Sequence, residues 1–139
     1  MEKRYYIDTS IWRDYYENRA DNLRPLGEWA FEFFKKMNEE RNIVLFSDLV
    51  VEELLIEYSR DEIEEILRIL HRGGALKKVE ISAVQQEEAR KFAADLKIPR
   101  KDALHAILAR DNGAILVTRD AHFLQLKEVV EVKKPEELI

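Results

Sequence analysis

The chain has 139 residues, of which 46% are hydrophobic and 37% are charged, and its formal net charge is −5. This length fits one domain, residues 1–139, with a core of ordinary size, and the hydrophobic content excludes an intrinsically disordered chain. Cysteine is absent, which excludes disulfides, thiol catalysis and cysteine-based zinc sites.

The composition also bears on the location and partners of the protein. No uncharged apolar stretch approaches the roughly 18 residues of a membrane span, and only Tyr5-Tyr6-Ile7 separates the charged start from Asp8. A secretory signal requires a longer apolar region, so we expect a cytoplasmic protein that does not associate with membranes. The negative net charge gives no long-range attraction to nucleic acid, but local Arg and Lys side chains could still bind phosphates.

The first half of the chain alternates short apolar runs with helical patterns. We expect a strand over residues 4–7, a helix from Thr9 or Ser10, a second helix with Pro25 in its first turn, a strand over residues 43–46 and a helix capped by Ser47 or Asp48. The apolar side chains of the second helix recur at helical spacing, which indicates that one of its faces is buried.

The second half continues the same alternation. We expect a helix from Asp61 to Gly73-Gly74, then a strand over residues 77–81, then a helix that starts at the capping box Ser82 to Gln85 and ends before Pro99. A helix over residues 100–112 should follow and end at Gly113. The last expected elements are a strand over residues 114–117 and an edge strand over residues 129–132. This order predicts an α/β domain with a central, mostly parallel sheet flanked by helices.

Four carboxylates lie where this pattern changes from one element to the next. Asp8 and Asp120 directly follow predicted strands, where ligands bind in parallel sheets. Asp102 opens a predicted helix, and either Glu52 or Glu53 lies one turn inside another, since apolar residues flank both. Carboxylates gathered from distant segments repel one another, and Mg²⁺ or Mn²⁺ would relieve that repulsion. Taken singly, each acid is better explained as a helix cap, a turn residue or an exposed position than as a metal ligand.

Neighbouring polar residues strengthen the metal hypothesis. Ser10 and Thr118 are predicted to orient the carboxylates or to donate to a bound phosphate. Arg100 and Arg119 flank the predicted site and are the candidates for contacts with a phosphate backbone. His105 lies three residues after Asp102, on the same helical face, and is predicted to be a packed helix residue rather than a ligand or proton shuttle.

Four segments resemble the motifs of PIN-domain nucleases, in order and in spacing. They are Tyr6-Ile7-Asp8-Thr9-Ser10, Ser47 to Leu54, Asp102-Ala103-Leu104-His105-Ala106 and Leu116 to Phe123. The resemblance implies a three-layer PIN-like fold with the metal on Asp8, Glu53, Asp102 and Asp120. It therefore selects Glu53 over Glu52. The sequence departs from many relatives at His122, where they carry another acid, which leaves the number of metal ions open.

The resemblance also implies a function. It points to a metal-dependent endoribonuclease, the toxin of a VapBC-type toxin–antitoxin pair, that leaves 5′-phosphate and 3′-hydroxyl ends and forms a homodimer. In such toxins the early helices help to form the groove that the antitoxin grips, so part of the aromatic set on these helices is expected to form a partner surface. That set is Trp12, Tyr15, Tyr16, Trp29, Phe33 and Phe34.

Other functional classes fit the sequence less well. A phosphoacceptor receiver domain needs paired acids after its first strand, and a haloacid-dehalogenase-type phosphatase needs Asp-x-Asp, but here Asp8 is followed by Thr9 and Ser10. The alternative that remains is a PIN-like module that processes RNA outside any toxin system, or that binds RNA or protein without cutting.

Overall fold

The computed structural model describes residues 3–139. Its centre is one sheet in which every pairing is parallel, with the strand order β3-β2-β1-β4-β5. The strands are β1 (Arg4–Ile7), β2 (Ile43–Phe46), β3 (Leu76–Lys78), β4 (Ile115–Val117) and β5 (Val132–Lys133). The expected α/β architecture is confirmed, and the sheet is entirely rather than mostly parallel.

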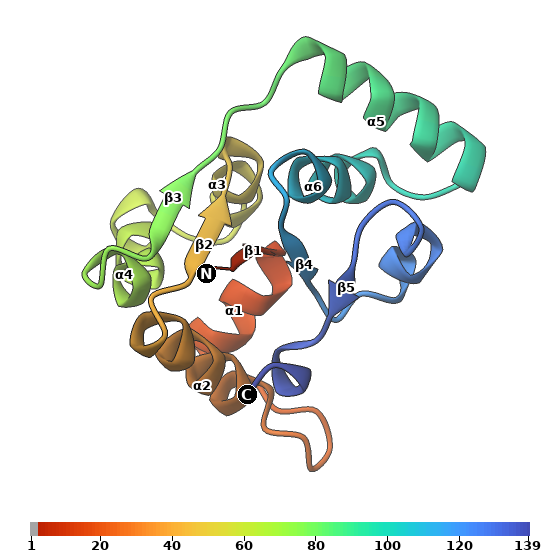
Figure 1. The fold of residues 1–139 in the computed structure, drawn as a ribbon. Helices are drawn as coiled ribbons and strands as arrows, with labels where there is room; N and C mark the ends of the chain where they lie inside the picture. Colours follow the sequence, from red (N-terminus) through yellow and green to blue (C-terminus); the bar gives the residue numbers. More distant parts are fainter. Residues whose placement is uncertain (1–2) are drawn as a thin grey trace.

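The helices follow the strands along the chain (Figure 1). They are α1 (Thr9–Glu17), α2 (Leu26–Glu39), α3 (Asp48–Leu54), α4 (Arg60–His71), α5 (Ala83–Leu96) and α6 (Arg100–Asp111), with the 3-10 helices η1 (Ala121–Leu126) and η2 (Pro135–Glu137) near the end. No helix within residues 3–139 is both long enough and apolar enough to cross a bilayer.

Successive residues of β1 show how the layers are arranged. The ring of Tyr5 meets Phe33 of α2 at a centroid distance of 5.7 Å, and the ring of Tyr6 meets His105 of α6 at 5.4 Å. Because neighbouring side chains of a strand point to opposite faces, α2 and α6 cover opposite faces of the sheet. Helices α1 and α4 pack with α2, and α5 packs on α6. The expected three layers are therefore present.

Several element boundaries differ from the predictions. The third strand lies at Leu76–Lys78 rather than over residues 77–81, and the last at Val132–Lys133 rather than over residues 129–132. Pro25 precedes α2 as its N-cap instead of lying in its first turn. Helix α4 begins at Arg60, because Ser59 forms a capping box there.

The aromatic set on α1 and α2 belongs mainly to the core. Trp12, Phe33 and Phe34 are fully buried, and the rings of Trp12 and Phe34 stack at 4.8 Å. Tyr15, Tyr16 and Trp29 are partly buried. Core packing therefore accounts for half of the set outright, and the partly buried rings are the members that could contact a partner.

Candidate metal centre

Asp8 lies at the carboxyl end of β1, beside the end of β4. Its carboxylate is buried and does not cap α1. Instead Oδ2 accepts hydrogen bonds from the hydroxyls of Ser10 at 2.7 Å and Thr118 at 2.9 Å. The hydroxyls expected to orient the acids therefore do so at Asp8. The explanation of Asp8 as a simple helix cap is wrong, because its side chain makes no capping hydrogen bond.

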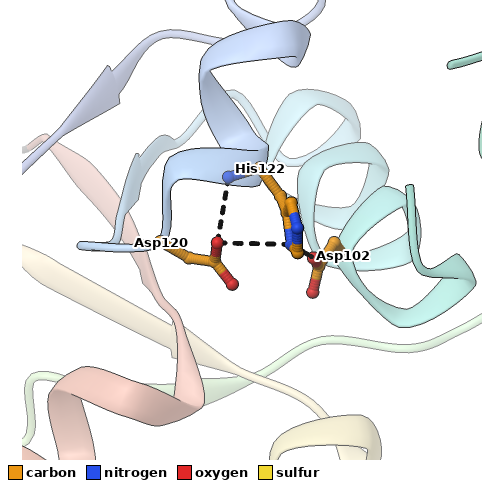
Figure 2. Close-up of side chains that lie close together, drawn as sticks. All are labelled: Asp102, Asp120 and His122. Carbon is orange, nitrogen blue, oxygen red and sulfur yellow. Dashed lines mark hydrogen bonds and ion pairs between the residues drawn. The ribbon is translucent and has the colours of Figure 1, made fainter. Parts of the chain in front are cut away.

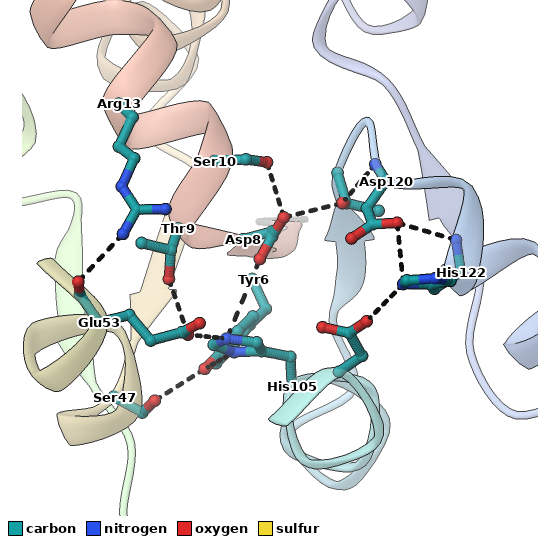
Figure 3. Close-up of polar contacts among 12 residues, drawn as sticks. Tyr6, Asp8, Thr9, Ser10, Arg13, Ser47, Glu53, His105, Asp120 and His122 are labelled. Carbon is teal, nitrogen blue, oxygen red and sulfur yellow. Dashed lines mark hydrogen bonds and ion pairs between the residues drawn. The ribbon is translucent and has the colours of Figure 1, made fainter. Parts of the chain in front are cut away.

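Glu53 reaches the same region from α3. Its Oε1 accepts a hydrogen bond from the Thr9 hydroxyl at 3.0 Å and lies 2.5 Å from Nε2 of His105. Arg13 holds the helix end behind it by donating to the backbone carbonyl of Glu53 at 3.0 Å. Glu52, by contrast, is exposed. The Glu53 side chain therefore points toward Thr9 and His105 (Figure 3), and Glu53 rather than Glu52 remains the predicted ligand.

Hydrogen bonds keep Glu53 ionised although its carboxyl group is partly buried. Burial raises the pKa of this carboxyl group, but the hydrogen bonds from His105 and Thr9 and the charge of Lys101 together lower it below its usual value. The side chain therefore offers a carboxylate, the form that binds a hard cation.

Asp102, Asp120 and His122 form a second group, from α6 and the segment after β4. One ligand atom from each lies within 4.8 Å of the other two, and Figure 2 shows the three side chains facing one another. Nδ1 of His122 is 3.1 Å from Oδ2 of Asp102 and 3.3 Å from Oδ1 of Asp120. Asp120 also accepts a hydrogen bond from the backbone N–H of His122 at 2.9 Å, so it caps η1 as well.

The charge on Asp102 is poorly compensated by protein groups. Burial raises the pKa of its carboxyl group, and the negative charges of Asp120 and Asp8 raise it further, against smaller opposing effects from His122 and His105. A divalent cation among these acids would reverse that balance. Carboxylate oxygens and one imidazole nitrogen are also donors that such cations accept, so the residues present fit a bound Mg²⁺ or Mn²⁺.

Two histidines enlarge the site beyond the four predicted acids. His105 is fully buried, as expected for a packed residue, but it contacts Glu53 directly and its Nε2 lies 3.9 Å from Oδ1 of Asp8. His122 stands where many relatives carry an acid and presents a nitrogen donor to Asp102 and Asp120. In the sequence, the i, i+3 spacing from Asp102 indicates that His105 lies near the site, and the departure from the family pattern at position 122 draws attention to His122.

The two arginines expected to meet phosphates differ in availability. Arg119 makes a bidentate ion pair with Glu136 of η2 at 2.7 and 2.8 Å, and its guanidinium lies 5.8 Å from the ring centroid of Trp29. A substrate phosphate would have to displace Glu136 from this side chain. Arg100 is exposed in the first turn of α6, two residues before Asp102, and remains the candidate phosphate contact.

Comparison with known proteins gives one family and one fold. The model of the PIN domain family matches residues 5–129. No curated protein matches the chain significantly in sequence.

Three solved structures illustrate the similarity in fold. VapBC2 from Rickettsia felis bound to promoter DNA superposes with a TM-score of 0.69 at 17% identity, over 94% of this chain and 98% of that one. VapBC from Salmonella typhimurium bound to DNA superposes with a TM-score of 0.62 at 17% identity, over 97% of this chain and 99% of that one. FitAcB from Neisseria gonorrhoeae superposes with a TM-score of 0.60 at 19% identity, over 94% of this chain and 97% of that one. At these identities the likeness concerns the fold.

Proposed function

The chain belongs to the PIN domain family, a family of nucleases, and from this we propose that it is a metal-dependent endoribonuclease, the toxin of a VapBC-type toxin–antitoxin pair. The observation that carries the proposal is that acids from four separate segments form two neighbouring pairs: Asp8 and Glu53 both lie next to His105, and Asp102 lies next to Asp120. Structural neighbours that are VapBC complexes support the more specific toxin assignment.

We assign the cation to the four carboxylates, with His122 as an added nitrogen donor beside Asp102 and Asp120. When bound, Mg²⁺ or Mn²⁺ supplies Lewis-acid stabilisation of a phosphate and lowers the pKa of a coordinated water. A mixed oxygen and nitrogen set favours Mn²⁺ over Mg²⁺, because imidazole suits transition metals better than it suits Mg²⁺.

The side chains of this site have separable tasks. Ser10 and Thr118 hold Oδ2 of Asp8, so its Oδ1 is the oxygen better placed for coordination. Within residues 3–139, both side-chain hydrogen bonds to the Glu53 carboxylate fall on Oε1, which leaves Oε2 for the cation. Arg100 would neutralise a phosphate of the RNA next to the scissile bond. Fixed carboxylates and a positive flank position the substrate for in-line attack by water.

Cleavage of an RNA panel with and without Mn²⁺ tests the proposed activity. The parent protein should cut RNA only with the cation, and Asp8→Asn should abolish cutting, because it removes a negative ligand while keeping the shape of the side chain. Asp95→Asn, an exposed position on α5, is the matched control and should cut normally. If Asp8→Asn cuts as well as the parent, the metal assignment is wrong. If the parent binds Mn²⁺ but cuts no RNA, a binding module is the better description.

We further propose an antitoxin partner, which the VapBC neighbours support, and a homodimer, which the resemblance to VapC-type toxins implies. The most exposed large apolar side chains of the early helices and their connections are Leu23, Phe31 and Ile56, at 98%, 45% and 74% exposure, and a partner would cover such groups. Co-expression with the product of an adjacent small reading frame should yield a complex that no longer cuts RNA. Free toxin after co-expression, with unchanged activity, would contradict the partner assignment.

A further inference from the structure

A chain of buried polar groups leads from the interior of the sheet to Glu53. The hydroxyl of Tyr6 lies 2.7 Å from the hydroxyl of Ser47 and 2.8 Å from Nδ1 of His105. Nε2 of the same imidazole ring is the atom that lies 2.5 Å from Oε1 of Glu53. Tyr6, Ser47 and His105 are all fully buried. Figure 3 shows the sequence of contacts, which joins β1, the start of α3 and α6.

Counting donors and acceptors fixes the direction of these hydrogen bonds. Within residues 3–139, Ser47 Oγ has Tyr6 as its one side-chain partner, so the Ser47 hydroxyl must donate to the Tyr6 oxygen to avoid a stranded buried proton. The Tyr6 hydroxyl then donates to Nδ1 of His105. Nδ1 is thereby an acceptor, so the imidazole carries its proton on Nε2 and donates it to Glu53. Every buried proton in this arrangement has an acceptor.

Burial of the Tyr6 hydroxyl is unfavourable unless the hydroxyl makes hydrogen bonds, which a phenyl ring cannot make. A buried hydroxyl requires hydrogen-bond partners to offset its lost hydration, whereas phenylalanine would fill the same space between β1 and α6 without that requirement. Burial raises the pKa of this phenol far above its usual value, so it remains protonated and able to donate. The hydroxyl is thus fully committed to its two neighbours.

We propose that Tyr6 and His105 are positioning residues that fix the carboxylate of Glu53 before any metal binds. The inference rests on the proposed function, because it concerns the metal ligand assigned there. With Oε1 held by His105 and Thr9, the carboxylate cannot rotate freely, and Oε2 is left for the cation. Loss of the Tyr6 hydroxyl releases the imidazole ring, and Glu53 then pays an ordering cost on binding the cation.

Titration calorimetry with Mn²⁺ on the full chain tests this role. Tyr6→Phe should weaken Mn²⁺ binding by about 10- to 100-fold, the usual effect of removing an outer partner of a metal ligand. Tyr5→Phe is the matched control, because it deletes the same atom from the same strand on the face that meets Phe33. It should change the affinity less than twofold. Equal affinities of Tyr6→Phe and the parent would overturn the proposal.

Variants of His105 separate positioning from mere packing. His105→Gln keeps an N–H donor near the place of Nε2, whereas His105→Leu keeps the volume and removes the donor. We expect Mn²⁺ affinity within a few-fold of the parent for glutamine and a loss similar to that of Tyr6→Phe, or larger, for leucine. If both variants bind Mn²⁺ equally well, the imidazole does not position Glu53.

A measurement without metal or substrate completes the test. The ¹⁵N shifts of the His105 ring in the metal-free parent protein should show a neutral imidazole protonated on Nε2, and Tyr6→Phe should lose that single tautomer. An Nδ1-protonated ring in the parent would overturn the proposal, as would a parent that binds no Mn²⁺. A parent that binds Mn²⁺ with the expected differences among variants but cuts no RNA would overturn only the proposed function.

Discussion

Replacing Asp102 with asparagine should stabilise the metal-free protein at neutral pH. The ligand atoms of Asp102 and Asp120 lie within 4.8 Å of each other. At that separation two unit charges repel by about 0.9 kcal/mol in bulk water and by about 3.5 kcal/mol at an effective dielectric constant of about 20. Asp102 also lies in the first turn of α6, where a negative charge stabilises the helix by about 0.3–1 kcal/mol. The repulsion is the larger effect, so we expect a net gain of about 1 kcal/mol.

The pH dependence of the stability difference between parent and variant tests this prediction independently. The pKa of Asp102 is raised in the folded protein above the ordinary value of 3.8, so the folded state binds its proton more tightly than the unfolded chain does. The resulting penalty is absent below that ordinary value, grows as the pH rises toward the folded pKa, and is complete above it. The advantage of the asparagine variant should therefore be full at pH 7 and should shrink as the pH falls toward 4.

Thermal unfolding in EDTA measures the effect, and 1 kcal/mol corresponds to about 3–5 °C in Tm for a chain of this size. Asp61→Asn is the matched control, because it removes a first-turn acid from α4 away from the site, and it should lower Tm slightly. Mn²⁺ at 100 times its Kd should stabilise the parent by about 2.7 kcal/mol and the Asp102 variant by less, which reverses their order. A variant that is no more stable than the parent in EDTA at pH 7 would refute the reasoning.

Three further predictions test the site and the fold. Glu53→Gln should reduce Mn²⁺-dependent RNA cleavage by at least about 100-fold, whereas the exposed neighbour Glu52→Gln should leave it unchanged; equal rates would refute the choice of Glu53. Gly27→Ala should lower the free energy of unfolding by about 1–3 kcal/mol in urea titrations, because its Cβ would lie 2.4 Å from the Cα of Asn18. Leu116→Ala in buried β4 should cost about 2–5 kcal/mol, and a loss below 1 kcal/mol would contradict its placement in the core.

The central strands could be predicted from sequence because they are buried on both faces. Runs such as residues 4–7 and 43–46 are almost continuously apolar, which is what a central parallel strand requires. The two edge strands were misplaced because an edge strand has one partner and a weaker apolar signal. Val129 and Val130 look like a strand in sequence, but they follow a turn in which their N–H groups donate to the carbonyl of Leu126.

The residues of the candidate site also differ in how well sequence spacing alone predicts them. Asp8 and Asp120 could be chosen as candidates from sequence because they follow strands, and parallel strands bring their carboxyl ends to one edge. Glu53 could not be distinguished from Glu52 by helical periodicity. The hydrogen bond from Thr9 and the contact with His105 distinguish it in the structure, and both come from segments distant in the sequence.

The strand order has a consequence for the timing of synthesis. β1 is made well before β4, yet the two strands are neighbours at the centre of the sheet. One of the two hydrogen bonds that orient Asp8, the one from Thr118, joins residues 110 positions apart. A nascent chain therefore holds Asp8 and Glu53 without Thr118, His105, Asp102 and Asp120 until translation has passed Asp120. If this protein cuts RNA as proposed, the ribosome that makes it does not meet a complete site until β4 and the segment that follows it have been translated.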